Sequence, residues 1–189
     1  KALLMSPYFV PGDERLRALQ GMRAREVQVG VVTNSLAAND VVAVHGGYMQ
    51  YRAPLLAAGV QLYELKAHGQ ASSSGIFGSS GASLHTKAFV LDDRHGFVGS
   101  FNLDPRSAYV NTEMGVVFDD PVLARQLTRE YLHLASPEQS WWLALDPHGD
   151  LRWLDRQAPP RWLQTEPDSS LRQRATARVI SWLPLESQL

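Results

Sequence analysis

The sequence predicts an α/β fold with a mixed, largely parallel central sheet, helices on both faces and a Trp-rich C-terminal extension. Strand and helix signals alternate over residues 1–65, an order typical of parallel strands joined by helical crossovers. All five Trp lie within residues 141–189, which indicates a change of composition near residue 140. We therefore expect one unit over residues 1–140 and an extension over residues 141–189.

Apolar runs and turn signals define the elements expected in the first part of the chain. They are a strand at residues 2–6, a Pro-rich turn at 7–12, a helix behind Asp13, a strand at 27–32, a polar loop at 33–35, a helix at about 40–58 and a strand at 60–65. Asp13 is a favourable N-cap, Pro54 marks a kink or a break, and Gly59 suits a C-cap. Because ligands bind outside the carboxyl ends of strands in such sheets, we expect residues 33–35 to lie near an active site.

Residues 66–83 hold four Gly and six Ser, too many for a packed element. Their triplet Gly75, Gly78 and Gly81 lacks the spacing of a dinucleotide-binding fingerprint. Two interpretations stay open: a mobile linker, or a lid over a cleft, since long loops inside compact domains are often functional.

The elements expected after this loop are closely spaced. They are a strand at residues 84–91, a turn at 92–93, a short strand ending at Gly99, a loop at about 102–107, a strand at 113–118 and a helix from Pro121 to about residue 135. Residues 136–189 are rich in Pro and Trp and give weaker signals.

Composition narrows the classes of function. The formal net charge of -1 weakens an assignment as a general nucleic-acid binder, because such domains carry a basic excess. The absence of cysteine excludes disulfide scaffolds, thiolate zinc sites and cysteine nucleophiles. No apolar run approaches the ~20 residues that span a bilayer.

The most informative pattern is H-x-K-x4-D-x6-G-S-x-N, which runs from His85 to Asn102. On a strand, His85 and Lys87 would share a face, because side chains alternate. An imidazole that can attack or move a proton, beside an ammonium that holds negative oxygens, suits an anionic substrate. Ser100 and Asn102 add a hydroxyl and an amide, which bind phosphate without charge. Six specified residue types at this spacing arise by chance with a probability on the order of 10⁻⁶.

This pattern resembles the signature of the phospholipase D superfamily. Other segments are similar to C-type bacterial cardiolipin synthases over most of residues 1–155. They are Ser6-Pro7-Tyr8-Phe9-Val10-Pro11-Gly12, Thr33-Asn34-Ser35-Leu36-Ala37-Ala38-Asn39-Asp40, His45-x-Gly47-Tyr48, Leu62-Tyr63-Glu64-Leu65-Lys66, Asn102-x-Asp104-Pro105-Arg106-Ser107 and Asn111-Thr112-Glu113. The resemblance implies a phospholipase D-like α/β/α sandwich.

The resemblance also implies a mechanism and residue roles. One His attacks a phosphodiester to form a phosphohistidine, a second His protonates the leaving alcohol, and an acceptor hydroxyl or water resolves the intermediate, with no metal or other cofactor. The catalytic residues would be His85, favoured as the general acid/base, with Lys87 and Asp92, the latter holding the geometry of the motif. Lys87, Ser100 and Asn102 would bind phosphoryl oxygens, and Glu113 would orient the imidazole.

This chain departs from the two-motif pattern because it carries one copy. No second His-x-Lys occurs in the sequence. The second motif would come from an N-terminal half of a longer enzyme, which the abrupt start at Lys1 favours, or from a second copy of the chain. His45 and Tyr48 are expected one helical turn apart, as a buried polar pair or as residues bordering the substrate cleft.

Residues 171–183 carry three Arg and no acidic residue. As a helix, they would place Leu171, Ala175, Val179, Trp182 and Leu183 on one face. Two interpretations stay open: an interfacial helix on a membrane of anionic lipids, or a terminal helix docked on its own domain.

The resulting prediction is a phosphatidyltransferase that forms cardiolipin, peripheral at a bacterial inner membrane. Its partners would be phospholipids, with phosphatidylglycerol favoured, the membrane surface and the second motif; no nucleic acid is expected. The alternatives are a single-motif phosphodiesterase or nuclease acting as a homodimer, and a non-catalytic half-domain that completes a partner. Intact His85, Lys87 and Asn102 argue against the last.

Overall fold

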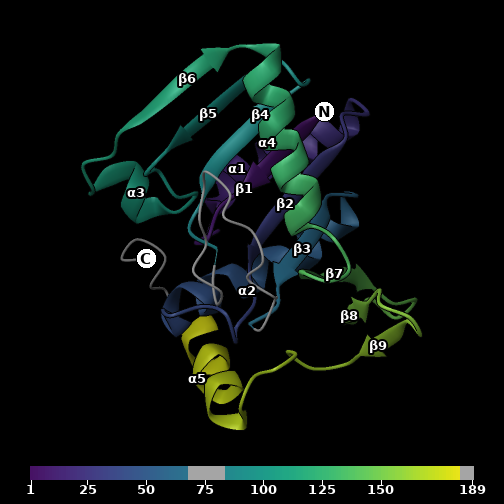
Figure 1. The fold of residues 1–189 in the computed structure, drawn as a ribbon. Coiled ribbons are helices and arrows are strands. Elements are labelled where there is room, and N and C mark those ends of the chain that lie inside the picture. The colour runs from purple at the N-terminus through teal and green to yellow at the C-terminus, as the bar shows by residue number, and fades with distance from the viewer. Residues whose placement is uncertain (68–83, 184–189) are drawn as a thin grey trace.

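The computed structural model describes residues 1–67 and 84–183, and within them nine strands form one sheet (Figure 1). The strands are β1 (Ala2–Met5), β2 (Val29–Asn34), β3 (Gln61–Leu65), β4 (Lys87–Leu91), β5 (His95–Gly99), β6 (Gly115–Asp119), β7 (Ser140–Leu145), β8 (Leu151–Asp155) and β9 (Arg161–Leu163). Their order across the sheet is β6-β5-β4-β1-β2-β3-β7-β8-β9. The predicted linker or lid lies outside the described residues, apart from its first two positions.

The sheet is mixed, as predicted, but "largely parallel" overstates its parallel part. β1 pairs in parallel with β2, and β2 with β3. Every other neighbouring pair is antiparallel. Helices separate the three central strands along the chain, whereas short turns join β4 to β5 and β7 to β8. Such turns can connect only antiparallel strands, because a parallel pair needs a long crossover.

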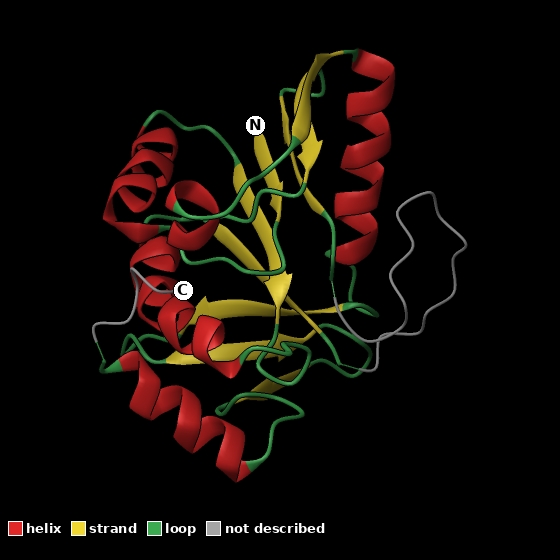
Figure 2. Ribbon diagram, turned by 90° about the vertical axis from the view of Figure 1, so that its left-hand side faces the viewer, coloured by secondary structure: helices red, strands yellow, loops and turns green. Residues whose placement is uncertain are grey.

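Helices cover both faces of the sheet, as Figure 2 shows edge-on. They are α1 (Gly12–Ala24), α2 (Val42–Ala57), α3 (Pro105–Tyr109), α4 (Pro121–Leu134) and α5 (Leu171–Ser181). α1 and α2 lie over β2, β3 and β7, and α4 lies over β1, β4 and β5. Val29 and Val31 of β2 therefore belong to one apolar core, and Val32 belongs to the other. α/β topology with two covered faces is confirmed.

Two predicted helix signals behave differently in the structure. α1 begins at Gly12, and Asp13 lies in its first turn without capping it, so the N-cap prediction is wrong. A carboxylate there still favours the helix, because the positive end of the helix dipole is close. α2 runs through Pro54 without a break, and Gly59 follows it at φ 84°, a backbone conformation that suits glycine.

The C-terminal part of the chain continues the same sheet. β7 pairs with β3 and is followed by β8 and β9. Trp141 and Trp153 are buried in the core beside α2, whereas Trp162 and Trp182 are exposed. α5 packs on α2 at the end of the molecule away from β6 (Figure 1). No helix among the described residues has the length and apolar character needed to cross a bilayer.

Candidate active site

Sheet topology brings the two parts of the His-to-Asn pattern to one edge. β4 is antiparallel to β1, so its first residues lie beside the carboxyl end of β1, with Ala88 opposite Met5. β5 is antiparallel to β4, and Lys87 lies opposite Gly99. His-x-Lys at the start of one strand and Gly-Ser-x-Asn at the end of the next therefore become neighbours.

His85 lies just before a strand rather than on it. β4 begins at Lys87, so the prediction that His85 and Lys87 share a strand face is wrong. Asn34, buried at the end of β2, instead fixes this segment: its Nδ2 donates to the Leu84 carbonyl at 3.3 Å, and its Oδ1 accepts from the Leu84 amide at 2.8 Å. These paired bonds hold the peptide next to His85 and leave its side chain exposed. The predicted location of residues 33–35 near the site agrees with this contact.

The Lys87 ammonium is bound to the backbone of the same segment. Its Nζ donates to the His85 carbonyl at 2.9 Å. Partial burial lowers the pKa of Lys87, and the carboxylates of Glu113, Asp104 and Asp40 oppose that shift. A partly desolvated ammonium interacts more strongly with a phosphoryl oxygen than a fully hydrated one does.

Ser100, just after β5, and Glu113, just before β6, are joined by a hydrogen bond beside Lys87. The Ser100 hydroxyl donates to Glu113 Oε2 at 2.5 Å and accepts from the Met114 amide at 2.9 Å, and Asn111 Nδ2 donates to Glu113 Oε1 at 3.3 Å. The Ser100 bond, assisted by bonds from Ser107 and Asn111 and by the charge on Lys87, lowers the pKa of Glu113. No hydrogen bond joins Glu113 to His85 among the described residues, so its role toward an imidazole stays a prediction.

Asn102 lies on a loop that the N-terminal segment holds in place. Ser6 Oγ accepts from the Leu103 amide at 3.1 Å, and the Val10 amide donates to the Leu103 carbonyl at 2.7 Å. Asn102 is buried, and its Oδ1 has no hydrogen-bond partner among the described groups. A buried carbonyl oxygen without a partner is costly and would accept a bond from a donor, whereas a phosphoryl oxygen, which also accepts, would be bound by the Nδ2–H groups of the same amide.

An apolar cavity of about 240 Å³ opens beside these polar groups. It lies between the β4–β5–β6 end of the sheet and the loop that carries Asn102. Its lining comprises Met5, Ser6, Ala88, Phe89, Phe97, Phe101, Leu103, Glu113, Met114 and Gly115. Phe89 and Phe97 stack with ring centroids 5.5 Å apart. The site thus combines polar groups of the kind that can bind a phosphate with room for an apolar moiety.

Asp92 does not join this cluster. It lies after the last residue of β4, with its side chain 76% exposed, and its amide donates to the Lys1 carbonyl at 3.0 Å. The five steps from Lys87 to Asp92 span roughly 16 Å of strand. Asp92 therefore lies away from the other motif residues, in the β4–β5 turn, where it adopts φ 50°; its role in holding the geometry of the motif stays a prediction.

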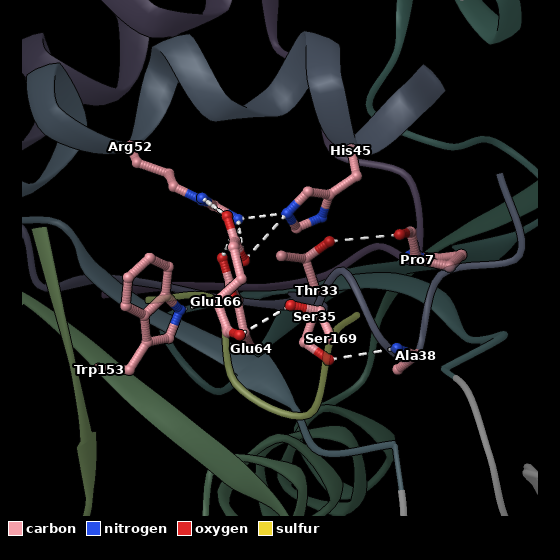
Figure 3. Close-up of polar contacts among 10 residues, drawn as sticks. All are labelled: Pro7, Thr33, Ser35, Ala38, His45, Arg52, Glu64, Trp153, Glu166 and Ser169. Atoms are coloured by element: carbon pink, nitrogen blue, oxygen red, sulfur yellow. Dashed lines mark hydrogen bonds and ion pairs between the residues drawn. The ribbon is translucent and has the colours of Figure 1, made fainter. Parts of the chain in front are cut away.

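A second polar cluster is buried where α2, β3 and the segment before α5 meet (Figure 3). Arg52 of α2 forms ion pairs with Glu64 of β3 at 2.8 Å and with Glu166 at 2.5 Å, and its Nη2 lies 2.5 Å from His45 Nε2. Trp153 Nε1 donates to Glu64 at 2.8 Å. These contacts tie the segment before α5 to the central sheet.

The two carboxyl groups of this cluster have pKa values shifted in opposite directions. Burial raises the pKa of the Glu166 carboxyl group, but the nearby Arg52 and His45 outweigh this effect and lower the pKa of Glu166 to about 2. Burial dominates at Glu64 and raises its pKa, with Arg52 opposing. Tyr48 stacks edge-on against His45, and both are buried. Of the two interpretations of His45 and Tyr48, the buried polar pair is therefore correct.

Several contacts that shape these clusters were not predicted. Asn34 lies within residues 33–35, which were expected near the site, but its bonds to Leu84 were not foreseen. The bond between Ser6 and Leu103 was missed, although Ser6 ends an apolar strand. Glu166 was missed because no local pattern reports its bond to Arg52, which joins positions 114 residues apart. Among residues 1–67 and 84–183, no group of three or more His, Cys, Asp or Glu side chains is arranged to hold a metal ion.

Comparison with known proteins supplies independent information. Residues 1–135 match a family model described as cardiolipin synthase, PLD-like domain. The chain is 43% identical to cardiolipin synthase C of Escherichia coli (strain K12), covering 97% of this chain and 40% of that protein. It is 31% identical to cardiolipin synthase A of Edwardsiella ictaluri, covering 85% of this chain and 28% of that protein. The chain thus spans less than half the length of these relatives.

Solved structures share the fold at low sequence identity. One is a phospholipase D family member, Nuc from Salmonella typhimurium, with a TM-score of 0.53 and 19% identity over 70% of this chain and 75% of that one. Another is phosphatidylserine synthase from Haemophilus influenzae, with a TM-score of 0.52 and 14% identity over 95% of this chain and 37% of that one.

Proposed function

This chain belongs to the cardiolipin synthase family of phospholipase D-like domains, and from that premise we propose that it is one catalytic half of a phosphatidyltransferase that forms cardiolipin. The half-site carries one His-x-Lys motif. The observation that carries the proposal is the convergence of His85, Lys87, Ser100 and Asn102 at one sheet edge. His85 is exposed there, with no hydrogen bond to its ring among the described residues.

The proposed reaction is a double displacement at phosphorus. An imidazole nitrogen of one motif attacks the phosphodiester and forms a P–N bond as the P–O bond to the leaving alcohol breaks. The imidazolium of the other motif gives its proton to that alcohol and then removes a proton from the acceptor hydroxyl, which attacks phosphorus and releases the first imidazole. We assign the acid/base role to His85. Lys87 and the Asn102 amide would hold the non-bridging oxygens.

The second motif would face His85 across the exposed surface beside Glu113. Five apolar side chains are exposed here on α3, β6 and the segment between them: Tyr109, Val110, Met114, Val116 and Val117. A patch of this kind favours a protein partner. Glu113, bound to Ser100 and Asn111 rather than to His85, would then be placed to orient the partner's imidazole.

The apolar cavity favours a lipid over a nucleic-acid substrate. A phosphodiester bound by Lys87 and Asn102 could place its glycerol and first acyl carbons among Phe89, Phe97 and Leu103. A net charge of -1 gives little attraction for a polyanion. We infer that the enzyme works peripherally at the surface of a bacterial inner membrane, where its substrates reside.

Lipid mass spectrometry tests the proposal directly. Phosphatidylglycerol vesicles are incubated with the chain alone, which reports assembly from two copies, and with the chain co-expressed with a segment carrying a first His-x-Lys motif. We expect cardiolipin from one of these forms, and a loss of at least about 10²-fold in His85→Ala. His95→Ala is the matched control, since this exposed His lies at the far end of β5.

Each other outcome overturns part of the proposal. Phosphatidic acid in place of cardiolipin would make the protein a hydrolase. Cleavage of DNA without lipid turnover would favour a nuclease. Full cardiolipin formation by His85→Ala, or no turnover of either substrate by any form, would remove the catalytic role.

A further inference from the structure

A large arginine-lined cavity lies outside the candidate active site, between α5, α2 and the β7–β8 turn. Its volume is about 590 Å³. Among the described residues, its lining includes Arg52, Arg152, Arg174 and Arg178, together with the indoles of Trp153 and Trp182. The acidic residues in this described lining are Asp150 and Glu166.

Two of these arginines are neutralised and two are not. Arg52 is paired with Glu64 and Glu166, and Arg152 is paired with Asp146 and Asp150. For Arg174 and Arg178, by contrast, no carboxylate lies within ion-pair distance in the part of the chain that the structure describes. Arg174 Nε is also shielded from solvent without a hydrogen-bond partner.

The way α5 docks decides which of its faces stays free. Ala177 is fully buried against α2. A Cβ added at Gly46 would lie 2.8 Å from Ile180 Cγ2 and 3.0 Å from the Ala177 carbonyl oxygen. Glycine at this position of α2 therefore lets the two helices approach closely. The helix is docked, as one sequence-based interpretation proposed, but through Ala177 and Ile180.

The apolar face predicted for this helix is not the docked one. Leu171, Val179, Trp182 and Leu183 are all exposed, and Trp182 retains 74% of its accessible surface while bordering the cavity. Two unpaired arginines thus lie beside exposed aliphatic and indole groups on one short helix. This combination matches an interfacial helix, where cations meet headgroups and Trp lies at the boundary.

We propose that this cavity binds the headgroup phosphate of an anionic phospholipid in a bilayer, as a docking site separate from the catalytic one. Arg174 and Arg178 hold the phosphate oxygens, and Trp182 with its aliphatic neighbours enters the interface beside them. A membrane lipid is favoured because its phosphate complements the charge of Arg174 and Arg178, and because exposed apolar groups border the cavity. This inference rests on the proposed function, which brings the protein to a phospholipid surface.

The test measures binding without turnover. All proteins carry His85→Ala, so lipid is not consumed, and co-flotation is compared on phosphatidylglycerol-containing and pure phosphatidylcholine vesicles. We expect Arg174→Gln with Arg178→Gln to weaken binding to the anionic vesicles about tenfold or more, since each Arg near such a surface contributes ~1 kcal/mol. Trp182→Ala should weaken binding to both kinds of vesicle.

A matched control distinguishes binding at this cavity from a general effect of removing two positive charges. Arg125 and Arg129 have the same spacing on α4 and are exposed on the other face of the sheet, so Arg125→Gln with Arg129→Gln should bind as the parent does. An equal loss in this control would overturn the proposal. So would displacement of the protein from vesicles by millimolar inorganic phosphate, which would identify a free-anion site.

Failure here can be told apart from failure of the proposed function. If the arginine pair proves irrelevant to vesicle binding while cardiolipin forms in the activity assay, only the docking site is lost. If vesicles bind as expected but no lipid is converted, only the catalytic proposal is lost. Thermal unfolding of each variant shows whether the helix stays docked.

Discussion

The clusters around His85 and around Arg52 each combine an imidazole, a cation and a carboxylate, and they differ in how far these groups are buried and paired. Arg52, Glu64 and Glu166 are buried, and each has an ionic partner within the cluster. Among the described residues, His85 is exposed with no hydrogen bond to its ring, and the side-chain carbonyl oxygen of Asn102 lacks a partner.

The same residue types therefore have different roles in the two clusters, stabilising the fold in one and, by our proposal, acting on a substrate in the other. Buried charges remain in a fold only when their partners offset the loss of hydration. Groups that bind and convert a substrate must keep bonds unmade until the substrate arrives. Removing a residue from the Arg52 cluster should therefore change stability, whereas removing one from the His85 cluster should change turnover.

The largest effect on stability is expected from Arg52→Met. This change leaves Glu64 and Glu166 buried without their cation, and breaking a buried ion pair costs about 3–5 kcal/mol. Arg94→Met is the control, because Arg94 is 60% exposed and pairs with Asp119 at the surface, where such pairs contribute about 1 kcal/mol or less. Urea unfolding measures both, and equal losses would contradict the contrast.

An intermediate effect on both properties is expected from Asn34→Ala. The variant loses both bonds to Leu84, which should lower the free energy of unfolding by about 1–3 kcal/mol. The loss also releases the peptide beside His85. Because this peptide positions the imidazole, kcat should fall more than KM rises. Asp120→Ala likewise removes two backbone bonds, at the start of α4, but lies away from the site. A similar drop in kcat there would remove the positioning role of Asn34.

The smallest effect on the free energy of unfolding is expected when the pH is lowered and Glu166 of the Arg52 cluster becomes protonated. The pKa of Glu166 falls to about 2 in the folded protein, below the ordinary value near 4.3, so its stabilising contribution is present above pH 4.3 and is lost as pH falls toward 2. The stability advantage of the wild type over Glu166→Gln should shrink by on the order of 1 kcal/mol at pH 3.5. Urea unfolding at pH 7, 5 and 3.5 measures this difference, and a constant gap would exclude the ion pair as its source.

Much of the candidate site was predictable because its signal is local. His85, Lys87, Ser100 and Asn102 stand at fixed spacing along 18 consecutive positions, 85–102, and one hairpin folds them together. The strands and helices up to β3 also follow from hydrophobic pattern. The distance of Asp92 from this group was less visible in the sequence, because its spacing from Lys87 is the full length of strand β4.

The antiparallel outer strands and the cluster around Arg52 were not predictable in this way. Pairing of β7 with β3 joins segments separated by α3, α4 and three strands, and no local pattern encodes such a pairing. The exposed apolar face of α5 was misjudged for a related reason. Its burial depends on which residues of α2 are small enough to approach, and Gly46 selects Ala177 and Ile180.

The sequence by itself determined the family and the set of side chains from which the proposed chemistry is built, including the single His-x-Lys motif. These follow from residue identities at short range, where spacing along the chain is close to spacing in the fold. Only the tertiary structure decided which polar groups are satisfied and which are left open, because burial and partner choice arise from contacts between distant segments. That division separates His85, which is exposed, from His45, which is enclosed beside Arg52.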